Sequence, residues 1–232
     1  MTQLEAAREG RITQAMQEVA EYEGIDPETV RAGVADGRIV IPRNIHHEFA
    51  ARGIGKGLAT KVNANIGTSP SHFNLDEELE KLDAAVHVGV DAVMDLSTGG
   101  DLDAVLTRIK AHSPVMLGTV PIYKSVSKVL AEGGKCVDLT ADAIFAEIEN
   151  QARLGVDFIT VHCGITRHSL SVLKSCDRMM GMVSRGGSLL AEWIMQNDRE
   201  NPLFEQYDRL LAIAGEHDVT LSLGDGLRPG TI

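Results

Sequence analysis

From residue 61 onward, segments with strand character alternate with segments with helix character, and this alternation constrains the fold more than any other feature. The strand-like runs cover residues 61–66, 91–96, 114–120, 157–161, 179–183 and 219–223. Each run is separated from the next by at least one segment long enough for a helix. Strict alternation predicts parallel strands joined by right-handed crossovers. The fold class is therefore α/β, and the candidates are a doubly wound sheet and a (β/α)8 barrel.

Capping residues mark several of the predicted helices. Asn74, Asp101 and Thr140 stand where an N-cap is expected, because their side-chain oxygens can accept hydrogen bonds from the first free N–H groups. Gly89 and Gly155 stand where a left-handed C-cap is expected. We also predict helices from about 123 to 132, from about 188 onward, and over 202–215.

The first 57 residues follow a different pattern. Thr2, Thr13 and Asp26 each precede a short helical segment, and residues 38–42 have the character of a short strand. A glycine-containing linker at 53–57 comes next. We therefore expect residues 1–57 to form a small helical cap and residues 58–232 to form the β/α part.

The barrel is favoured over the doubly wound sheet. The chain lacks an early G-x-G-x-x-G motif, which weakens a dinucleotide-binding fold. A barrel needs eight units and about 250 residues, and about six units can be recognised here. We expect an incomplete TIM-type barrel, and we expect the chain to be the N-terminal half of a longer protein. Its two open sheet edges would be covered by the remainder or by a partner chain.

Composition excludes several classes of function. The formal net charge of −11 argues against a nucleic-acid partner. No apolar run approaches the roughly 18 residues that a membrane span needs, and the N-terminus lacks the apolar core of a secretory signal. Cys136, Cys163 and Cys176 form no C-x-x-C pair, so we expect neither a disulfide framework nor a metal site built from them. A cytoplasmic location is the simplest expectation.

Polar side chains and glycines follow all of the strand-like runs. The carboxyl ends of parallel strands lie on one face, where α/β enzymes bind their ligands. The polar and neighbouring residues at these ends are Asn63, Asn65, Gly67, Thr68, Ser69, Met94, Asp95, Ser97, Thr98, Thr119, Tyr123, His162, Cys163, Ser184, Arg185, Gly186, Gly187, Ser188, Asp225, Gly226 and Arg228.

Each of these residues alone also has a structural explanation. Asn65 could cap a turn, His162 could be a hydrogen-bonded core histidine, and Ser188 could be only an N-cap. Asp225 and Arg228 could pair with each other. Their coincidence at one face favours a binding site.

The residue types point to a phosphorylated, sugar-bearing small molecule. Arg185 beside glycines at a helix start suits a phosphate. The Asn, Tyr, His and Ser side chains can bond a polar heterocycle or a sugar, and Asp225 could hold a ribose hydroxyl or a ring amine, or serve as a base. No Ser-His-Asp or Cys-His arrangement can be assigned, so the catalytic residues stay unknown. An isomerase or aldolase is a weaker alternative, and no lysine follows a strand where a Schiff base would need it.

Five motifs resemble the phosphomethylpyrimidine synthase family, the thiamine pyrimidine synthases. They are Asn63-Ala-Asn-Ile-Gly67, Val93-Met-Asp-Leu-Ser-Thr-Gly99, Gly118-Thr-Val-Pro-Ile-Tyr123, Val183-Ser-Arg-Gly-Gly-Ser188 and Leu221-Ser-Leu-Gly-Asp-Gly-Leu-Arg-Pro-Gly230. The resemblance extends over nearly the whole chain. It implies a radical S-adenosylmethionine enzyme on a (β/α)8 barrel that rearranges 5-aminoimidazole ribotide to 4-amino-5-hydroxymethyl-2-methylpyrimidine phosphate.

The resemblance also implies which residues bind the substrate. By motif match these are Asn65, Met94, Tyr123, His162, Ser184, Arg185, Gly186, Asp225, Gly226, Leu227 and Arg228. Met94 would not have been chosen from its residue type, because a methionine at that place suggests core packing. The family implies a [4Fe–4S] cluster, S-adenosylmethionine, a second divalent metal (zinc or iron) and a homodimer. The ligands of the cluster and the metal correspond to positions beyond residue 232, so this chain alone is expected to be inactive and to hold no metal.

Two departures from the commonest family pattern leave a paralogue open. The segments 67–73 and 161–168 differ from that pattern. A 5-hydroxybenzimidazole synthase, which takes the same ribotide toward the lower ligand of cobalamin, shares the five motifs. A non-catalytic ribotide-binding fragment is the alternative of another class.

Overall fold

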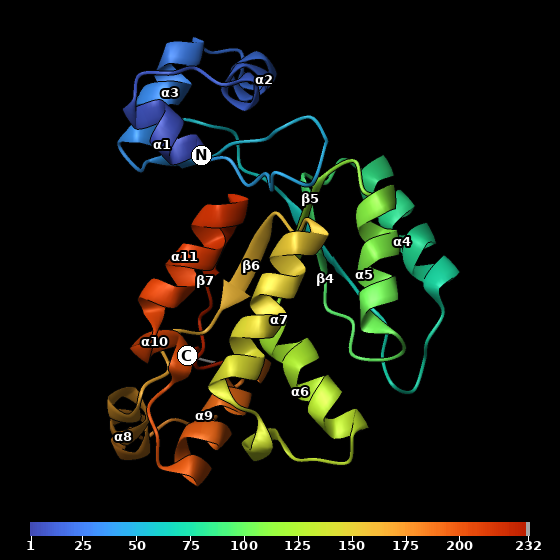
Figure 1. Cartoon of the computed structure of the whole chain (residues 1–232), viewed down its shortest axis with the longest axis vertical. Helices are drawn as coiled ribbons and strands as arrows, with labels where there is room; N and C mark the ends of the chain where they lie inside the picture. The colour runs from blue at the N-terminus through green and yellow to red at the C-terminus, as the bar shows by residue number, and fades with distance from the viewer. Residues whose placement is uncertain (231–232) are drawn as a thin grey trace.

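A parallel sheet with helices packed around it forms the body of the protein, and a small helical cap lies at one end (Figure 1). The computed structural model describes residues 1–230. The α/β class predicted from the alternation of segments is confirmed.

The elements have the following bounds in chain order. They are α1 (Gln3–Arg8), α2 (Gln14–Glu23), α3 (Pro27–Ala35), β1 (Ile39–Val40), β2 (Ile54–Gly55), β3 (Asn63–Ile66), α4 (Leu75–His87), β4 (Ala92–Asp95), α5 (Leu102–His112), β5 (Met116–Thr119), α6 (Pro121–Ala131), the 3-10 turn η1 (Cys136–Asp138), α7 (Ala141–Leu154), β6 (Phe158–Val161), α8 (Arg167–Ser175), α9 (Arg185–Asn197), α10 (Pro202–Glu205), α11 (Tyr207–His217) and β7 (Thr220–Leu223).

The predicted helix caps are present in the structure. Thr2 forms a capping box with Glu5 at the start of α1, and Thr13 and Asp26 accept backbone N–H groups at the starts of α2 and α3. In the body, the side chains of Asn74, Asp101 and Thr140 cap α4, α5 and α7 in the same way, by accepting hydrogen bonds from first-turn amides. These side chains replace hydrogen bonds that the first helical turn cannot make internally.

The strands of the main sheet follow one another in space in the order in which they occur along the chain. All neighbouring pairs from β3 to β7 are parallel, in the order β3-β4-β5-β6-β7. A doubly wound sheet requires a reversal of strand order, and these five strands have none. Right-handed crossovers between strands in sequential order place the connecting helices on one face. Within residues 1–230 the sheet is open, with β3 and β7 at its edges.

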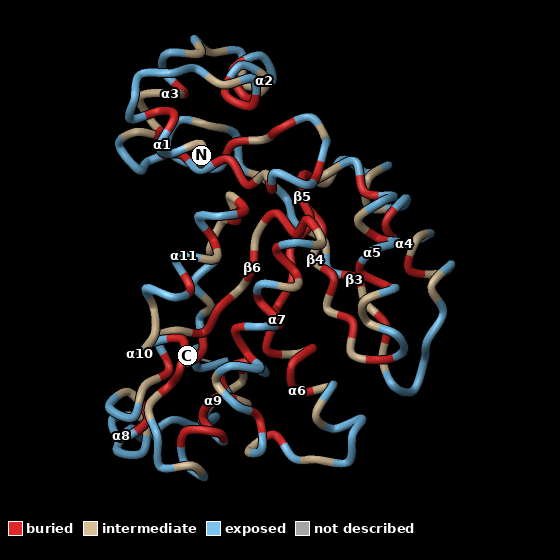
Figure 2. Tube along the Cα trace, viewed as in Figure 1, coloured by how far each residue is buried: buried red, intermediate tan, exposed pale blue. Residues whose placement is uncertain are grey.

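The two faces of the sheet differ in burial. Val93 and Leu117 are register partners, and Ile159 pairs with Thr119, two residues further along β5, so Val93, Leu117 and Ile159 share one face. These three residues are at most 1% exposed, because the helices pack against them. The opposite face carries Asn65 and Met94 and is only partly covered. Figure 2 shows the buried residues concentrated in the central strands and in the helix faces toward them.

The predicted strand at 179–183 is wrong. This segment has no strand pairing, and β6 pairs directly with β7. Met179 is 92% exposed. Two features explain the error: Gly181 interrupts the run, and unbranched methionines favour a strand less than β-branched residues do. The segment therefore belongs to one long crossover that contains α8, α9, α10 and α11, and residues 1–230 contribute five strands to the parallel sheet where six were predicted.

Smaller differences concern the helices. The helix α8 was not predicted, and the expected helix over 202–215 is divided into α10 and α11. The predicted strand at 38–42 is confirmed as β1, and its antiparallel partner β2 lies in the segment that was expected to be only a linker. The described part of the chain contains two separate apolar clusters, one within residues 7–58 and one within residues 64–227. The division of the chain after residue 57 stays a prediction.

One buried carboxylate joins the cap to the amino-terminal end of the sheet. Asp157, immediately before β6, is 0% exposed and accepts hydrogen bonds from the backbone N–H groups of Asn44 (2.9 Å) and Leu117 (2.7 Å). Asp157 also contacts His47, whose Nδ1 lies 2.7 Å from Oδ2 of the carboxylate. Nε2 of the same histidine donates to the carbonyl of Ser113. Burial raises the pKa of Asp157, and the bond with His47 acts in the opposite direction.

A second carboxylate at this end gives a testable pH dependence. Asp218 accepts a hydrogen bond from the Gln3 N–H (3.0 Å), and burial raises its pKa from 3.8 to about 6. The folded state therefore binds this proton more tightly than the unfolded state, so stability falls as the pH rises through the folded pKa. Asp218→Asn keeps an oxygen for Gln3 and tolerates the left-handed backbone at this residue (φ 54°). We expect the variant to have a higher Tm than the wild type at neutral pH, with a difference that shrinks toward pH 4.

The matched control is Asp198→Asn. Asp198 also has a left-handed backbone (φ 49°), but its side chain is 86% exposed. Calorimetric melting between pH 4 and pH 8 should show a pH-dependent gain for Asp218→Asn and none for Asp198→Asn. Equal Tm values of the Asp218 variant and the wild type at every pH would contradict this account.

Candidate functional site

The candidate site lies at the carboxyl ends of the strands, opposite the end that carries the cap. Asn65 in β3 and Met94 in β4 are Cα partners in the parallel register and belong to the less covered face of the sheet. Asn65 is exposed and accepts a hydrogen bond from Nδ2 of Asn63 (2.9 Å) through its amide oxygen. Both predicted residues are thus side by side at one edge of the site.

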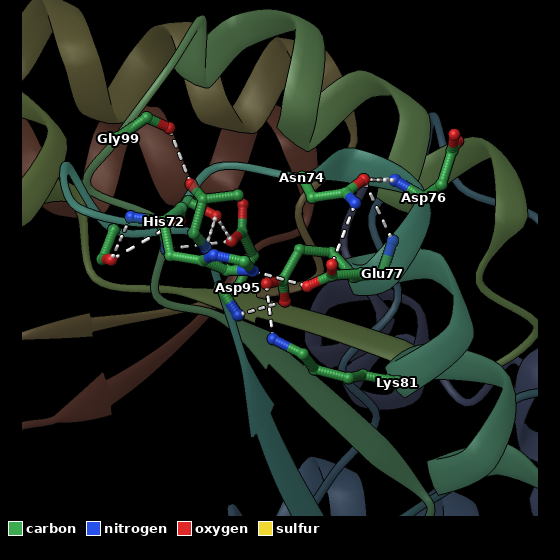
Figure 3. A network of polar contacts seen from close by, with 12 residues as sticks. His72, Asn74, Asp76, Glu77, Lys81, Asp95 and Gly99 are labelled. Atoms are coloured by element: carbon green, nitrogen blue, oxygen red, sulfur yellow. Dashed lines mark hydrogen bonds and ion pairs between the residues drawn. The ribbon is translucent and has the colours of Figure 1, made fainter.

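A polar network fixes the loops that follow β3 and β4 (Figure 3). The Gly67 N–H donates to Glu78 (2.7 Å), and the Thr68 hydroxyl donates to the carbonyl of Gly99 (2.7 Å). The Thr68 N–H donates to Oγ of Ser97, whose own N–H donates to Asp95. The bonds between the two loops hold them together as one wall of the site.

The role of Glu78 was missed in the sequence. It lies on the inner face of α4 with Leu75 and Leu82, and it is 1% exposed. A glutamate in the middle of an apolar helical face is a signal of a buried polar contact, and the partners are the Gly67 N–H and Lys81. Asp95 is also buried, and this burial raises its pKa.

A cavity of about 830 Å³ opens beside this wall. Its lining includes the loop 98–103, Tyr123 and Lys128 on α6, and Arg185 and Leu189 on α9. The guanidinium of Arg185 lies 5.1 Å from the centre of the Tyr123 ring, a cation–π contact. The volume is in the range of small-molecule sites. Of the residues predicted by motif match to bind the substrate, Tyr123 and Arg185 line this cavity.

His162 follows β6 and is packed between two glycines. A Cβ on Gly186 would lie 2.6 Å from Nδ1 of the ring, and a Cβ on Gly224 would lie 2.8 Å from Cδ2. Real Cβ contacts are longer, so both positions require glycine unless the ring moves. The imidazole is 4% exposed, and among residues 1–230 its Nδ1 has no hydrogen-bond partner.

The charge state of His162 follows from its surroundings. Burial lowers its pKa, the positive charge of Arg228 lowers it further, and the negative charge of Asp225 acts in the opposite direction. The ring is therefore neutral at physiological pH. A neutral imidazole offers one donor and one acceptor, and the buried Nδ1 has neither role satisfied within residues 1–230.

The start of α9 and the loop after β7 complete this cluster. Ser184 is the N-cap of α9, and its Oγ accepts a hydrogen bond from the Gly187 N–H (3.2 Å). A Cβ on Gly187 would lie 2.9 Å from Cα of Gly226, so the two backbones are in close contact. The first N–H groups of a helix lack internal partners and favour an anion, and Arg185 adds a full positive charge there.

The structure thus places the predicted residues in three groups. His162, Ser184, Gly186 and the 224–228 loop form one cluster, Arg185 connects that cluster to Tyr123, and Asn65 and Met94 lie on the neighbouring strands. Asp225 and Arg228 are exposed, whereas Leu227 packs against the core. The prediction that the loop 184–186 follows a strand is wrong. This loop starts a helix within the crossover from β6 to β7.

The cysteines do not fit an iron–sulfur cluster. Cys136 is buried, which raises its pKa, and burial raises the pKa of the half-buried Cys163 to about 11. Cys176 is exposed. Among residues 1–230, no group of three His, Cys, Asp or Glu side chains is arranged to hold a metal ion. Of the helices in this range, none combines the length and apolar character required to cross a membrane.

The sequential parallel sheet with polar loops at its carboxyl end defines an α/β protein of the kind that binds small molecules at strand ends. The chain belongs to the Radical SAM ThiC family, whose model matches residues 2–232. It is 53% identical over 232 residues to a phosphomethylpyrimidine synthase of Thermodesulfovibrio yellowstonii, and 53% identical over 234 residues to one of Thermus thermophilus. Both alignments cover 100% of this chain and 54% of the relative. The chain therefore spans about half the length of these curated relatives, and the family resemblance inferred from the motifs is confirmed.

The contact between Gly186 and His162 can be tested directly. Gly186→Ala inserts a methyl group against the buried ring, which should cost about 1–3 kcal/mol of stability, as overpacking does. We also expect the ring signals of His162 to shift in NMR spectra of histidine-labelled protein.

The matched control is Gly164→Ala, because Gly164 is only two residues from His162 in sequence but has open space where a Cβ would lie. This variant should leave both the Tm and the His162 signals nearly unchanged. Wild-type stability together with unshifted His162 signals in Gly186→Ala would contradict the packing described here.

Proposed function

We propose that this chain is the substrate-binding half of a phosphomethylpyrimidine synthase, a radical S-adenosylmethionine enzyme of thiamine biosynthesis. The substrate would be 5-aminoimidazole ribotide, and the product 4-amino-5-hydroxymethyl-2-methylpyrimidine phosphate. One observation carries the proposal: the neutral ring of His162 lies between Gly186 at the start of α9 and Gly224 after β7, so an anion site and a heterocycle-binding side chain adjoin. The named relatives, identical at about half of the positions, support it.

The ligand's phosphate fits the start of α9 by charge and by geometry. A 13-residue helix carries a partial positive charge at its N-terminus, and Arg185 can form paired hydrogen bonds to phosphate oxygens. Gly186 and Gly187, at the second and third helical positions, pack against His162 and Gly226, so these two residues would border the phosphate. In this proposal Ser184, Arg185 and Gly186 hold the phosphate.

The remaining predicted residues would hold the riboside. His162 can exchange one hydrogen bond with the aminoimidazole, and Asp225 can accept from a ribose hydroxyl or a ring amine. Asn65, Met94 and Tyr123 would contact the heterocycle or the sugar, and Gly226, Leu227 and Arg228 would enclose the ligand from the last strand. The catalytic residues stay unassigned.

The radical chemistry is assigned to the part of the full-length protein outside this chain. A radical S-adenosylmethionine family implies a [4Fe–4S] cluster and S-adenosylmethionine, and the cysteines of this chain do not suit the cluster. We propose that the remainder also supplies the second divalent metal site and the strands that close the (β/α)8 barrel. On this view the 232-residue chain binds the ribotide without turning it over, and the full-length enzyme is a cytoplasmic homodimer.

The reaction is tested with the full-length enzyme. Reconstituted protein given 5-aminoimidazole ribotide and S-adenosylmethionine should form 5′-deoxyadenosine and the pyrimidine phosphate. Formation of 5-hydroxybenzimidazole would instead identify the paralogue, and no turnover with an intact cluster would refute the assignment. Binding by this chain with an inactive full-length protein would favour a ribotide-binding role alone.

The phosphate site makes a prediction about Arg185. Arg185→Ala should weaken binding of 5-aminoimidazole ribotide by at least about tenfold, or ~1.4 kcal/mol, because a charge-assisted contact is lost. Binding of the riboside without phosphate should change little. Calorimetric titration with both ligands measures the difference.

Arg199→Ala is the matched control. Arg199 also lies over an aromatic ring, that of Trp193 at 5.9 Å, but it follows the far end of the same helix. The Arg199→Ala variant should bind both the ribotide and the riboside with wild-type affinity. An equal loss for ribotide and riboside in Arg185→Ala would contradict the placement of the phosphate.

A further inference from the structure

A buried asparagine outside the five motifs lies behind the His162 cluster. Asn201, the N-cap of α10, is 0% exposed. We propose that Asn201 is a positioning residue that sets the place of both His162 and the 224–228 loop; this proposal rests on the proposed function. The Asn201 side chain does not line the cavity, and it bonds His162 only at the backbone carbonyl, so its effect would pass through the backbone.

The first link is to the turn that carries His162. Nδ2 of Asn201 donates to the carbonyl of His162 (3.0 Å) and to the carbonyl of Ile165 (2.8 Å). The Ile165 N–H also faces the His162 carbonyl at 3.4 Å. One amide group therefore joins both ends of the turn 162–165. Both carbonyls are satisfied by a residue more than 35 positions away in the chain.

The second link leads through Ile165 to the last loop. Ile165 is 1% exposed, and a Cβ on Gly226 would lie 2.7 Å from its Cγ1. Gly226 in turn contacts Gly187 at the start of α9. Displacement of the Ile165 carbonyl would therefore move the side chain against which the 224–228 loop rests.

The donor and acceptor roles of Asn201 can be separated by one substitution. Its Oδ1 accepts from the Leu203 N–H (3.0 Å) and caps α10, whereas its Nδ2 makes the two bonds to the turn. An aspartate has the same shape and caps as well as asparagine. Ionised, it cannot donate, and it faces two carbonyl oxygens. Asn201→Asp thus retains the cap and removes the link to His162.

Asn197 provides a matched control. Its Nδ2 also donates to two backbone carbonyls, those of Val137 (3.1 Å) and Trp193 (3.0 Å), but it lies at the carboxyl end of α9, away from the turn. Asn197→Asp therefore reports the cost of losing two such bonds elsewhere in the same protein.

The experiment compares both variants with the wild type in three measurements. They are the Tm, the ring signals of His162 in NMR spectra of histidine-labelled protein, assigned by their loss in His162→Gln, and the Kd for 5-aminoimidazole ribotide. We expect both variants to lose stability. Only Asn201→Asp should shift the His162 signals and raise the Kd by about tenfold. Asn201→Ser, which keeps a cap and one shorter donor, should have an intermediate effect.

Several outcomes would overturn the proposal. Unshifted His162 signals in a folded Asn201→Asp or Asn201→Ser protein would do so, as would equal changes of signal and Kd in the Asn197 control. If the wild type fails to bind the ribotide, the proposed function fails. The His162 signals, which need no ligand, still decide whether Asn201 positions the ring. If Asn201→Asp does not fold, Asn201→Ser carries the same comparison.

Discussion

The candidate site depends on the close packing of His162 between Gly186 and Gly224. The pairing of β6 with β7 sets this distance, since the Gly224 N–H donates to the carbonyl of Val161 at 2.8 Å. The helix start can approach the ring from the other side only because Gly186 has no side chain. A neutral, oriented imidazole beside a positively charged helix start follows from these two contacts. The phosphate and heterocycle assignments therefore depend on backbone geometry as much as on side-chain identity.

The same strand, β6, connects this site to the amino-terminal end of the sheet, where the cap is attached. Asp157 precedes the strand and bonds the cap segment through Asn44 and His47, whereas His162 follows the strand. Residues at the amino-terminal ends of parallel strands usually serve stability, and those at the carboxyl ends serve chemistry. The strand between them has only four residues, so the anchored end and the ligand-binding end are joined by a short, fully paired segment.

Much of the fold was predictable because it is encoded locally. N-caps such as Thr13 and Asn74, and the alternation of strands with helices, depend on neighbouring residues alone. The segment 179–183 was mispredicted because a strand needs a pairing partner, and the edge of β6 is paired with β7 instead. For the site, residue type identified His162 and Arg185. The packing of Gly186 on His162, the contact of Glu78 with Gly67 and the links made by Asn201 join residues distant in sequence or hidden in a helix, so spacing could not predict them.

The central claim is that His162, the start of α9 and the loop after β7 form one site for a phosphorylated imidazole riboside. A crystal structure of the protein with 5-aminoimidazole ribotide tests it most directly. The account predicts the phosphate at the first turn of α9 beside Arg185, with the heterocycle within hydrogen-bond distance of His162. A ribotide bound elsewhere, or one with its phosphate away from α9, would contradict it.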